Sequence, residues 1–467
     1  MAKKDLPQNS RHDRAPAKHM TPPPARVGSH FEVARDIAAK ERAHLVGVVW
    51  GIESREAARR SLVELAALAR TAGADVVGET LQALRRPDVA TFVGKGKVAE
   101  IGHACAAAGA NVIVFDHDLS PGQARNVQEA TKVKVIDRSE LILDIFSRRA
   151  QTSVARAQVE LAQLEYQLPR LKNLWEHLSR LGGGIGTRGP GETQLEVDRR
   201  RVRERIGRLR ETLKKVERVR AVQRKGRKGT VSVALVGYTN AGKSTLMNRL
   251  SGADVFIEDQ LFATLDTTTR TVHLGREYTI LLTDTVGFIR KLPHQLIASF
   301  HATLEEVVTA DLLLVVVDGA DEDHLAQIET VNDVLDEIGA GQSRRLLVVN
   351  KRDRVRDEEA ALQLVRLHGP GVIVSARDGE GLADLERALI EFLRESRPLV
   401  VADLPLSAAR DLAELHARAE VVETEFSADN VRVTFRARDE DVEWLRGRGH
   451  RILTARDRII QSEEKAR

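Results

Sequence analysis

The sequence is short of cysteine, aromatic residues and long apolar runs. Its single cysteine, Cys105, excludes an intrachain disulfide, and its alanine-rich surroundings predict a buried side chain rather than a catalytic thiol. No apolar run approaches the roughly 18 residues that suggest a membrane span, and the N-terminus lacks the apolar core of a signal peptide. Aromatic residues make up only 4% of the chain, which argues against a stacking surface for single-stranded nucleic acid. These absences predict a cytoplasmic protein without a membrane span.

Size and composition predict a folded protein with several domains. A chain of 467 residues corresponds to three domains of about 150 residues each. The hydrophobic content of 42% and charged content of 30% are typical of soluble globular proteins. Residues 1–28 have scattered charges, a triple proline and almost no apolar pattern, so they predict a disordered, mildly basic tail.

A glycine-bounded motif is the most informative stretch of the chain. It follows the apolar run Val231–Val236, precedes the helix-forming stretch Leu246–Leu250, and has the spacing G-x-x-x-x-G-K-S. Gly237 and Gly242 let successive backbone N–H groups converge, and the helix N-terminus adds its positive dipole end. The motif therefore predicts a nucleotide-phosphate loop with these binding residues: Gly237, Tyr238, Thr239, Asn240, Ala241, Gly242, Lys243, Ser244 and Thr245.

Two later stretches predict a Mg²⁺ site beside this loop. The strand-like run Tyr278–Thr283 ends in Asp284-Thr-Val-Gly287, where Asp284 can hold Mg²⁺ through water and the Gly287 amide can approach the γ-phosphate. A threonine-rich loop, Phe262-Ala-Thr-Leu-Asp266, precedes that run and could fold over the nucleotide. The predicted metal residues are Ser244, Thr264 and Asp284. The predicted nucleotide-binding residues of the two stretches are Phe262, Ala263, Thr264, Leu265, Asp266, Asp284, Thr285, Val286 and Gly287.

Two further stretches predict that the base is guanine. A buried strand, Leu346–Val349, leads into Asn350-Lys-Arg-Asp353, and a carboxylate such as that of Asp353 can accept hydrogen bonds from guanine N1–H and N2–H₂. Adenine offers no such pair of donors, so an unpaired carboxylate would reject it. After the short strand Val372–Val374, a backbone N–H can meet guanine O6. The predicted base-site residues are Asn350, Lys351, Arg352, Asp353, Ser375, Ala376 and Arg377, and the whole set predicts a GTPase.

The region from Ala43 to Asp137 alternates between strand and helix patterns. Strands at 45–50, 75–84, 111–115 and 133–136 are separated by helices at 54–72, 97–108 and 121–131, which predicts a mainly parallel sheet. Its loop Val93-Gly-Lys-Gly-Lys97 fits the phosphate of a nucleotide or of RNA. A plain glycine turn with two solvated lysines explains the same loop equally well, because the pattern is short.

Between residues 138 and 229, two apolar stripes predict a pair of helices. Apolar residues recur at three- and four-residue steps from Leu161 to Leu181 and again from Val202 to Val216. Pro169 should kink or divide the first helix. Joined by one loop, the helices would form an antiparallel hairpin. Six of the ten loop residues from Gly182 to Gly191 are glycine. Ordering them costs entropy and adds little packing, so close backbone approach to a partner explains the loop better than stability does.

The second of these helices is strongly basic. From Arg199 to Gly229 there are 15 lysines or arginines and 3 acidic residues, while the whole chain carries a net charge of only +4. Pairing along the helix cannot neutralise this excess, so it predicts contact with an RNA phosphate backbone, and few aromatic residues favour structured RNA. The predicted RNA-binding residues of loop and helix are Gly183, Gly184, Arg188, Arg199, Arg200, Arg201, Arg203, Lys214 and Lys215.

The nucleotide motifs resemble those of translation-factor-related GTPases, and three stretches narrow the resemblance. Phe92-Val-Gly-Lys-Gly-Lys97, the glycine-rich stretch Gly182–Thr193 and the loop Phe262–Arg270 are similar to the HflX family of bacterial ribosome-associated GTPases. The resemblance covers about residues 30 to 397. It implies binding to the large ribosomal subunit and its rRNA, splitting of stalled ribosomes under stress, and ATP as a second nucleotide of the N-terminal domain. It also places the glycine loop near the peptidyl-transferase centre.

Catalysis at the predicted site would be mainly electrostatic, with Lys243, Thr264 and Gly287 as catalytic residues and Mg²⁺ as cofactor. Phe288 occupies the position at which many GTPases have a glutamine that orients the attacking water, and phenylalanine cannot make that hydrogen bond. Slow intrinsic hydrolysis and a partner that completes the site are expected. Asn240 matches the asparagine with which related GTPases hold K⁺; hydrogen bonding within the loop is its alternative role.

The predicted α/β architecture has five parts: a disordered tail (1–28), a parallel α/β domain that binds nucleotide or RNA (29–137), the helical hairpin with its glycine-rich tip (138–229), a GTPase domain with a mostly parallel sheet (230–397) and a small α/β domain (398–467). The favoured function is a monomeric GTPase that binds GTP and GDP and splits or rescues stalled ribosomes. A GTPase that supports rRNA or tRNA maturation or modification is the alternative. It would need an added catalytic domain, and Cys105 lacks the setting of a nucleophile.

The glycine tip and the basic helix should act differently. We expect Gly183→Val with Gly184→Val to spare GTP binding and most ribosome affinity, because the tip carries one charge, yet to abolish subunit splitting by blocking entry of the backbone into a narrow RNA-lined site. Light scattering with GTP present measures the splitting. A double variant that splits ribosomes at the normal rate would show that the tip is only a linker.

Overall fold

The computed structural model describes residues 41–51, 54–171, 190–225, 230–253, 261–275, 278–293, 296, 299–397, 399–437 and 439–453. The tail predicted at 1–28 and the glycine tip up to Gly189 lie outside the described residues, as do the leucines between 172 and 181. The described residues contain three sheets, each with its own helices. None of their helices has both the length and the apolar character needed to cross a bilayer.

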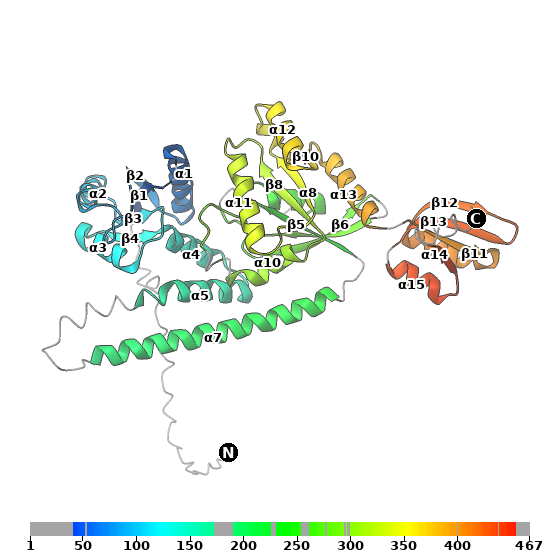
Figure 1. Cartoon of the computed structure of the whole chain (residues 1–467), viewed down its shortest axis with the longest axis horizontal. Helices are drawn as coiled ribbons and strands as arrows, with labels where there is room; N and C mark the ends of the chain where they lie inside the picture. Colours follow the sequence, from blue (N-terminus) through cyan, green and yellow to red (C-terminus); the bar gives the residue numbers. More distant parts are fainter. Residues whose placement is uncertain are drawn as a thin grey trace, which may run out of the picture. The chain divides into compact units, whose positions relative to one another are not determined.

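The first sheet is parallel throughout, as the alternating sequence pattern predicts. Its elements are β1 (Arg42–Val49), α1 (Arg55–Thr71), β2 (Asp75–Ala83), α2 (Lys95–Ala108), β3 (Val112–Phe115), α3 (Pro121–Thr131), β4 (Lys134–Asp137) and α4 (Arg138–Arg149). The strand order is β2-β1-β3-β4. α1 and α4 cover one face and α2 and α3 the other, so Leu45 and Val46 of β1 join separate apolar clusters (Figure 1). Both faces are buried, which explains the continuous apolar strands.

Two local features of this region differ from the sequence-based expectation. α2 begins at Lys95, two residues earlier than predicted, because the extended Gly94 serves as its N-cap. The predicted glycine loop 93–97 is therefore largely the first turn of a helix, and binding of ATP there stays a prediction. Residues 138–149, assigned from sequence to the hairpin, form α4 and pack beside α1. Cys105 is fully buried, as expected.

Two helices follow, α5 (Ser153–Gln167) and α7 (Pro190–Lys225). α5 ends two residues before Pro169, in agreement with the predicted division, and the last two residues of the predicted glycine loop are already helical in α7. The apolar stripes of α5 and α7 pack together as predicted, with these buried members: Leu161, Val202, Ile206, Leu209 and Leu213.

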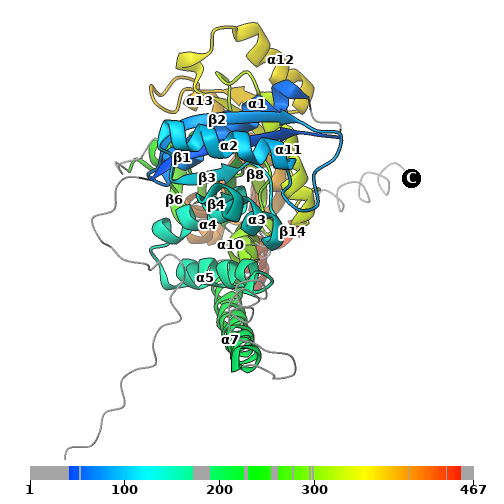
Figure 2. The same ribbon diagram turned by 90° about the vertical axis from the view of Figure 1, so that its left-hand side faces the viewer.

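Two ion pairs set the register between α5 and α7. Arg205 binds Glu160 through two contacts of 2.7 Å, and Arg210 binds Glu165 at 2.8 Å. Figure 1 shows α5 and α7 running in opposite directions, as predicted for the hairpin. α5 lies across one stretch of α7 in both views (Figures 1 and 2).

The second sheet has the order β10-β9-β8-β5-β7-β6 and is parallel except for the β6–β7 pair. Its elements are β5 (Val231–Gly237), α8 (Lys243–Ser251), β6 (Thr268–Leu274), β7 (Tyr278–Asp284), α10 (His301–Val308), β8 (Leu312–Asp318), α11 (His324–Glu337), β9 (Arg345–Asn350), the 3₁₀ turn η2 (Arg352–Arg354), α12 (Glu358–His368), β10 (Gly371–Ile373) and α13 (Leu382–Ser396). Alternate residues of β8 face α8 and α13 on one side and α10 to α12 on the other. The mostly parallel sheet is as predicted.

The third sheet is antiparallel and has the order β12-β13-β11-β14. Its elements are β11 (Leu399–Pro405), the 3₁₀ turn η3 (Leu406–Ala408), α14 (Ala409–Arg418), β12 (Glu420–Phe426), β13 (Asn430–Arg436), α15 (Asp439–Gly447) and β14 (Arg451–Leu453). The sequence predicts this α/β appendage except for β14, whose three residues are too few for a periodic pattern.

Two valines on α7 provide a matched test of its packing. Val202 is 8% exposed and Val222 is 70% exposed. We expect Val202→Ala to lower the opening free energy of α7 by about 1–3 kcal/mol through lost burial and a cavity. Val222→Ala should raise it by about 0.5 kcal/mol, because alanine is the better helix former. Amide hydrogen exchange along α7 measures both changes, and equal effects of the two substitutions would contradict this packing.

Candidate active site

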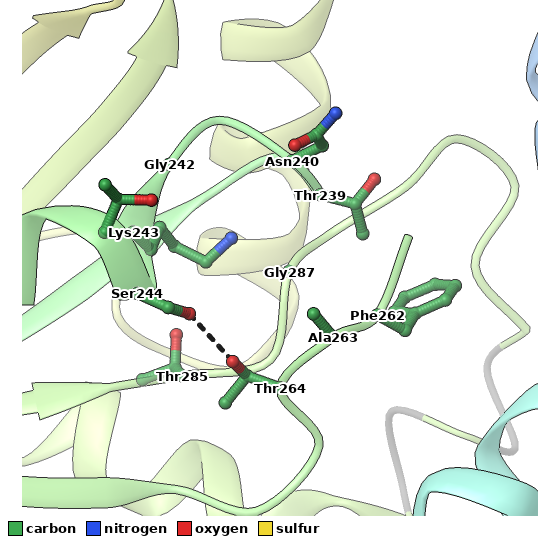
Figure 3. A pocket seen from close by; sticks show the side chains of 11 residues that line it. Thr239, Asn240, Gly242, Lys243, Ser244, Phe262, Ala263, Thr264, Thr285 and Gly287 are labelled. Atoms are coloured by element: carbon green, nitrogen blue, oxygen red, sulfur yellow. Dashed lines mark hydrogen bonds between the residues drawn. The ribbon is translucent and has the colours of Figure 1, made fainter. Parts of the chain in front are cut away.

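The glycine loop between β5 and α8 has the conformation that its sequence predicts. A Cβ atom at Gly237 would lie 2.1 Å from the Val316 carbonyl oxygen, and one at Gly242 would lie 2.2 Å from Asn350 Nδ2. Gly242 also has φ of +95° and caps α8, so both positions require glycine. The loop, the segment Phe262–Thr264 and Gly287 surround one cavity (Figure 3). A chain of backbone N–H groups at a helix start suits a phosphate group.

Lys243 lies buried at the centre of this cavity. Its ammonium group donates to the carbonyl oxygens of Gly237, at 3.1 Å, and Tyr238, at 2.8 Å. Burial lowers the pKa of Lys243 to about 8, although the nearby carboxylate of Asp284 opposes the shift. The side chain is therefore mostly protonated at pH 7. A cation that is poorly solvated in the free protein is well suited to bind phosphate oxygens.

Three oxygen-bearing side chains meet beside Lys243. Ser244 Oγ donates to Asp284 Oδ2 at 2.6 Å and lies 2.8 Å from Thr264 Oγ1 (Figure 3). Thr264 Oγ1 also donates to Asp284 Oδ2, at 3.3 Å. Asp284 Oδ1 is buried and has no hydrogen-bond partner among the described residues. Burial raises the pKa of Asp284, and Lys243 lowers it in part.

This arrangement fits Mg²⁺, the metal generally used by phosphate-loop GTPases, because hydroxyl and carboxylate oxygens are its usual protein ligands. Ser244 and Thr264 would hold the ion directly and Asp284 through water. When bound, the ion neutralises charge on the β- and γ-phosphates. Asn240 lines the same cavity with φ of +60°, and binding of K⁺ there stays a prediction.

The residues predicted to recognise guanine also come together. Asn350 joins the two loops of the base site, because its side chain donates to the Ala241 carbonyl oxygen at 2.8 Å and accepts from the Ala376 amide at 3.0 Å. Ser375 Oγ donates to Asp353 Oδ1 at 2.8 Å, which orients the carboxylate. Lys351 adopts a left-handed conformation and pairs with Asp318 at 2.7 Å.

Several predicted residues have other surroundings. Arg352 pairs with Glu358 at 2.5 Å, so its contribution near the base is its backbone. The carbonyl oxygen of Arg377 accepts from Arg249. Leu265 is buried in the core, and Asp266 accepts hydrogen bonds from Thr152 at the start of α5 rather than lining the cavity.

Tyr238 connects the nucleotide loop to the first sheet's helices. Its hydroxyl donates to Glu64 of α1 and accepts from the Arg290 amide at 2.8 Å. Burial, together with Glu64, raises the pKa of Tyr238. Arg290, Glu64 and Asp323 were not selected from sequence, because no local motif marks contacts between residues so distant in the chain.

The base site generates a specificity test. We expect Asp353→Asn to lower GTP affinity and to let xanthosine triphosphate compete, because the amide replaces one acceptor with a donor. Competition binding with GTP and xanthosine triphosphate measures this switch. Arg352→Ala is the control, since that side chain points to Glu358. Unchanged GTP affinity in the Asp353 variant would show that this carboxylate does not bind guanine.

Comparison with known proteins agrees with this geometry. Three family models match the chain: "GTP-binding GTPase N-terminal" at residues 59–147, "GTP-binding GTPase Middle Region" at 149–227 and "50S ribosome-binding GTPase" at 232–351. A GTP-binding protein from Sulfolobus solfataricus, solved with GDP, is similar with a TM-score of 0.41 and 23% identity, covering 75% of this chain and 98% of that one.

Curated relatives match over nearly their whole length. GTPase HflX of Escherichia coli K12 is 43% identical over 411 residues, which cover 87% of this chain and 96% of that protein. GTPase HflX of Caldanaerobacter subterraneus is 43% identical over 417 residues, covering 89% and 94%. GTPase HflX of Magnetococcus marinus is 46% identical over 394 residues, covering 84% and 91%. An identity this high over this much of each protein, joined to the nucleotide site described above, shows that the chain is a GTP hydrolase of the HflX family.

Proposed function

We propose that this GTPase associates with the ribosome, binds the large subunit and its rRNA, and uses GTP to split or rescue stalled ribosomes under stress. The printed description of the family model that matches the nucleotide domain, a 50S ribosome-binding GTPase, supports association with the ribosome. The splitting step extends the resemblance found in the sequence. The observation that carries the proposal is the basic surface of α7.

The basic side chains of α7 face away from its packed stripe. Arg200, Arg201, Arg203, Lys214 and Lys215 are exposed, whereas the apolar side chains between them are buried against α5. Glu160 and Glu165 of α5 neutralise Arg205 and Arg210. The net charge counted within 199–229 does not include these two glutamates, because they belong to α5. On α7 itself, Arg200 lies 3.9 Å from Glu204 and Arg201 lies 3.7 Å from Asp198. The exposed cations still outnumber these acidic neighbours and form a row suited to phosphate groups.

The surroundings of Phe288 support the prediction that GTP hydrolysis needs a partner. Its side chain is 1% exposed, because its backbone pairs with the nucleotide loop: the Thr239 amide donates to the Phe288 carbonyl oxygen at 2.8 Å, and the Phe288 amide donates to the Gly237 carbonyl oxygen at 3.1 Å. The ring therefore points into the core rather than toward the nucleotide. The buried phenylalanine cannot orient the attacking water, so a bound ribosome would have to complete or rearrange the site.

Ribosomal subunits provide the test of this function. We expect slow GTP hydrolysis by the purified protein and strong acceleration by large subunits but not by small subunits, with 70S ribosomes dissociating when GTP is present. Phosphate release and light scattering measure the two effects. Fast basal turnover that ribosomes leave unchanged would contradict the proposal. Binding restricted to precursor subunits or tRNA would favour the alternative role in RNA maturation.

Charge reversal on α7 tests the surface that carries the proposal. Lys214→Glu with Lys215→Glu should weaken ribosome binding and flatten its salt dependence, because up to two phosphate contacts are lost. Arg366→Glu with Arg387→Glu, on exposed faces of α12 and α13, makes the same change in charge elsewhere. Cosedimentation at several salt concentrations measures affinity. Equal losses in the two double variants would show only a general charge effect.

A further inference from the structure

A second cavity, of about 550 Å³, adjoins the nucleotide loop on the side of α1 and α11. It shares Thr239 and Asn240 with the phosphate cavity, so a side chain that lines it is close to the nucleotide site. Most of its other lining residues are charged. Arg290, two residues after Phe288, is among them.

One carboxylate oxygen in this cavity holds two guanidinium groups. Asp323 Oδ2 lies 3.1 Å from Arg290 Nη2 and 2.8 Å from Arg60 Nε. Asp323 lies just before α11, and Arg60 belongs to α1. The site therefore contains an arginine beside the nucleotide loop whose guanidinium is paired with a carboxylate.

The backbone of Arg290 is fixed, whereas its side chain has room to move. The Arg290 amide donates to the Tyr238 hydroxyl at 2.8 Å, and its carbonyl oxygen accepts from Arg138 Nη2 at 3.0 Å. Thr239 and Asn240 line the same cavity, so rotation of the Arg290 side chain within it would turn the guanidinium toward the nucleotide loop. Arg60 is less suited than Arg290 to contact the nucleotide. The Arg60 side chain is 48% exposed and belongs to α1, beside the first sheet, whereas the Arg290 side chain is 18% exposed.

We propose that Arg290 is a catalytic residue that contacts the γ-phosphate in the transition state, and that Asp323 holds it in a resting position. In hydrolysis the water oxygen bonds to the γ-phosphorus while the bond from phosphorus to the β–γ bridging oxygen breaks. The electron pair of the broken bond stays on GDP, and one proton of the water passes to an oxygen of the released phosphate. The guanidinium is chemically unchanged and neutralises the charge that develops on the phosphate oxygens. An arginine that neutralises this transition-state charge accelerates GTP hydrolysis by about 10³–10⁵-fold in other GTPases.

Because Asp323 restrains Arg290, removing the carboxylate should accelerate hydrolysis without any partner. We expect Asp323→Ala to raise basal kcat about tenfold or more, within the range that a free arginine can supply. Asp323→Ala with Arg290→Ala should remove this gain, and Arg290→Lys should restore only part of it, since lysine lacks the planar fork. Asp323→Ala with Arg60→Ala is the matched control and should keep the gain.

Two binding measurements separate catalysis from folding. Each variant should bind a non-hydrolysable GTP analogue as tightly as the unmodified protein, while Arg290→Ala should lose affinity for GDP with aluminium fluoride, which resembles the transition state. Millimolar guanidinium should partly restore kcat in Asp323→Ala with Arg290→Ala. The proposal fails if Asp323→Ala leaves kcat unchanged, or if the gain depends on Arg60 instead. The assay contains no ribosomes, so its result is independent of the proposed ribosomal function.

Discussion

The backbone pairing between the nucleotide loop and Phe288 is the constraint on which the rest of the site depends. It joins β5 to the segment that follows β7, and it fixes Gly287 where an amide can meet the γ-phosphate. A Cβ atom at Gly287 would lie 2.8 Å from Thr239 Cα and 2.9 Å from Lys243 Nζ. No side chain fits there without displacing the loop. The same segment carries the Phe288 ring, which is buried in the core at the position where many GTPases have a water-orienting glutamine.

The position of this segment is secured on its other side by a buried ion network. Arg138 is 1% exposed and binds Asp116, Glu64 and the Arg290 carbonyl oxygen. Lys291 also pairs with Asp116, at 2.7 Å. Burial alone would raise the pKa of Asp116, but Arg138 and Lys291 lower it overall. Removing one member of such a network leaves a buried charge without its partner, at a cost of about 3–5 kcal/mol. The first sheet is therefore joined to the segment that is predicted to contact the γ-phosphate.

The sequence predicts those parts of the structure that depend on residues close together in the chain. The strand–loop–helix around Lys243, the parallel sheets and the packed stripes of α5 and α7 each follow from short motifs or periodic patterns. Contacts between distant residues could not be predicted in this way. Asp266 was assigned to the nucleotide because it lies in a threonine-rich loop, yet it caps α5 through Thr152, 114 residues away. Arg138 reaches Arg290 across 152 residues, and no local pattern of either residue indicates the pairing.

Long-range contacts of this kind join the helices of the first sheet to two segments that are predicted to bind the nucleotide. Phe262 packs edge-on against Phe146 of α4, with ring centroids 4.6 Å apart, so the loop predicted to fold over the nucleotide also meets the first sheet's helices. The loop at Phe262 and the segment at Arg290 are thus joined to the first sheet's helices by different forces, an aromatic contact and a charged network. Breaking a buried ion network leaves a charge without its partner, whereas separating two aromatic rings leaves no unpaired charge. Displacing the segment at Arg290 from the first sheet's helices would therefore cost more free energy than displacing the loop at Phe262.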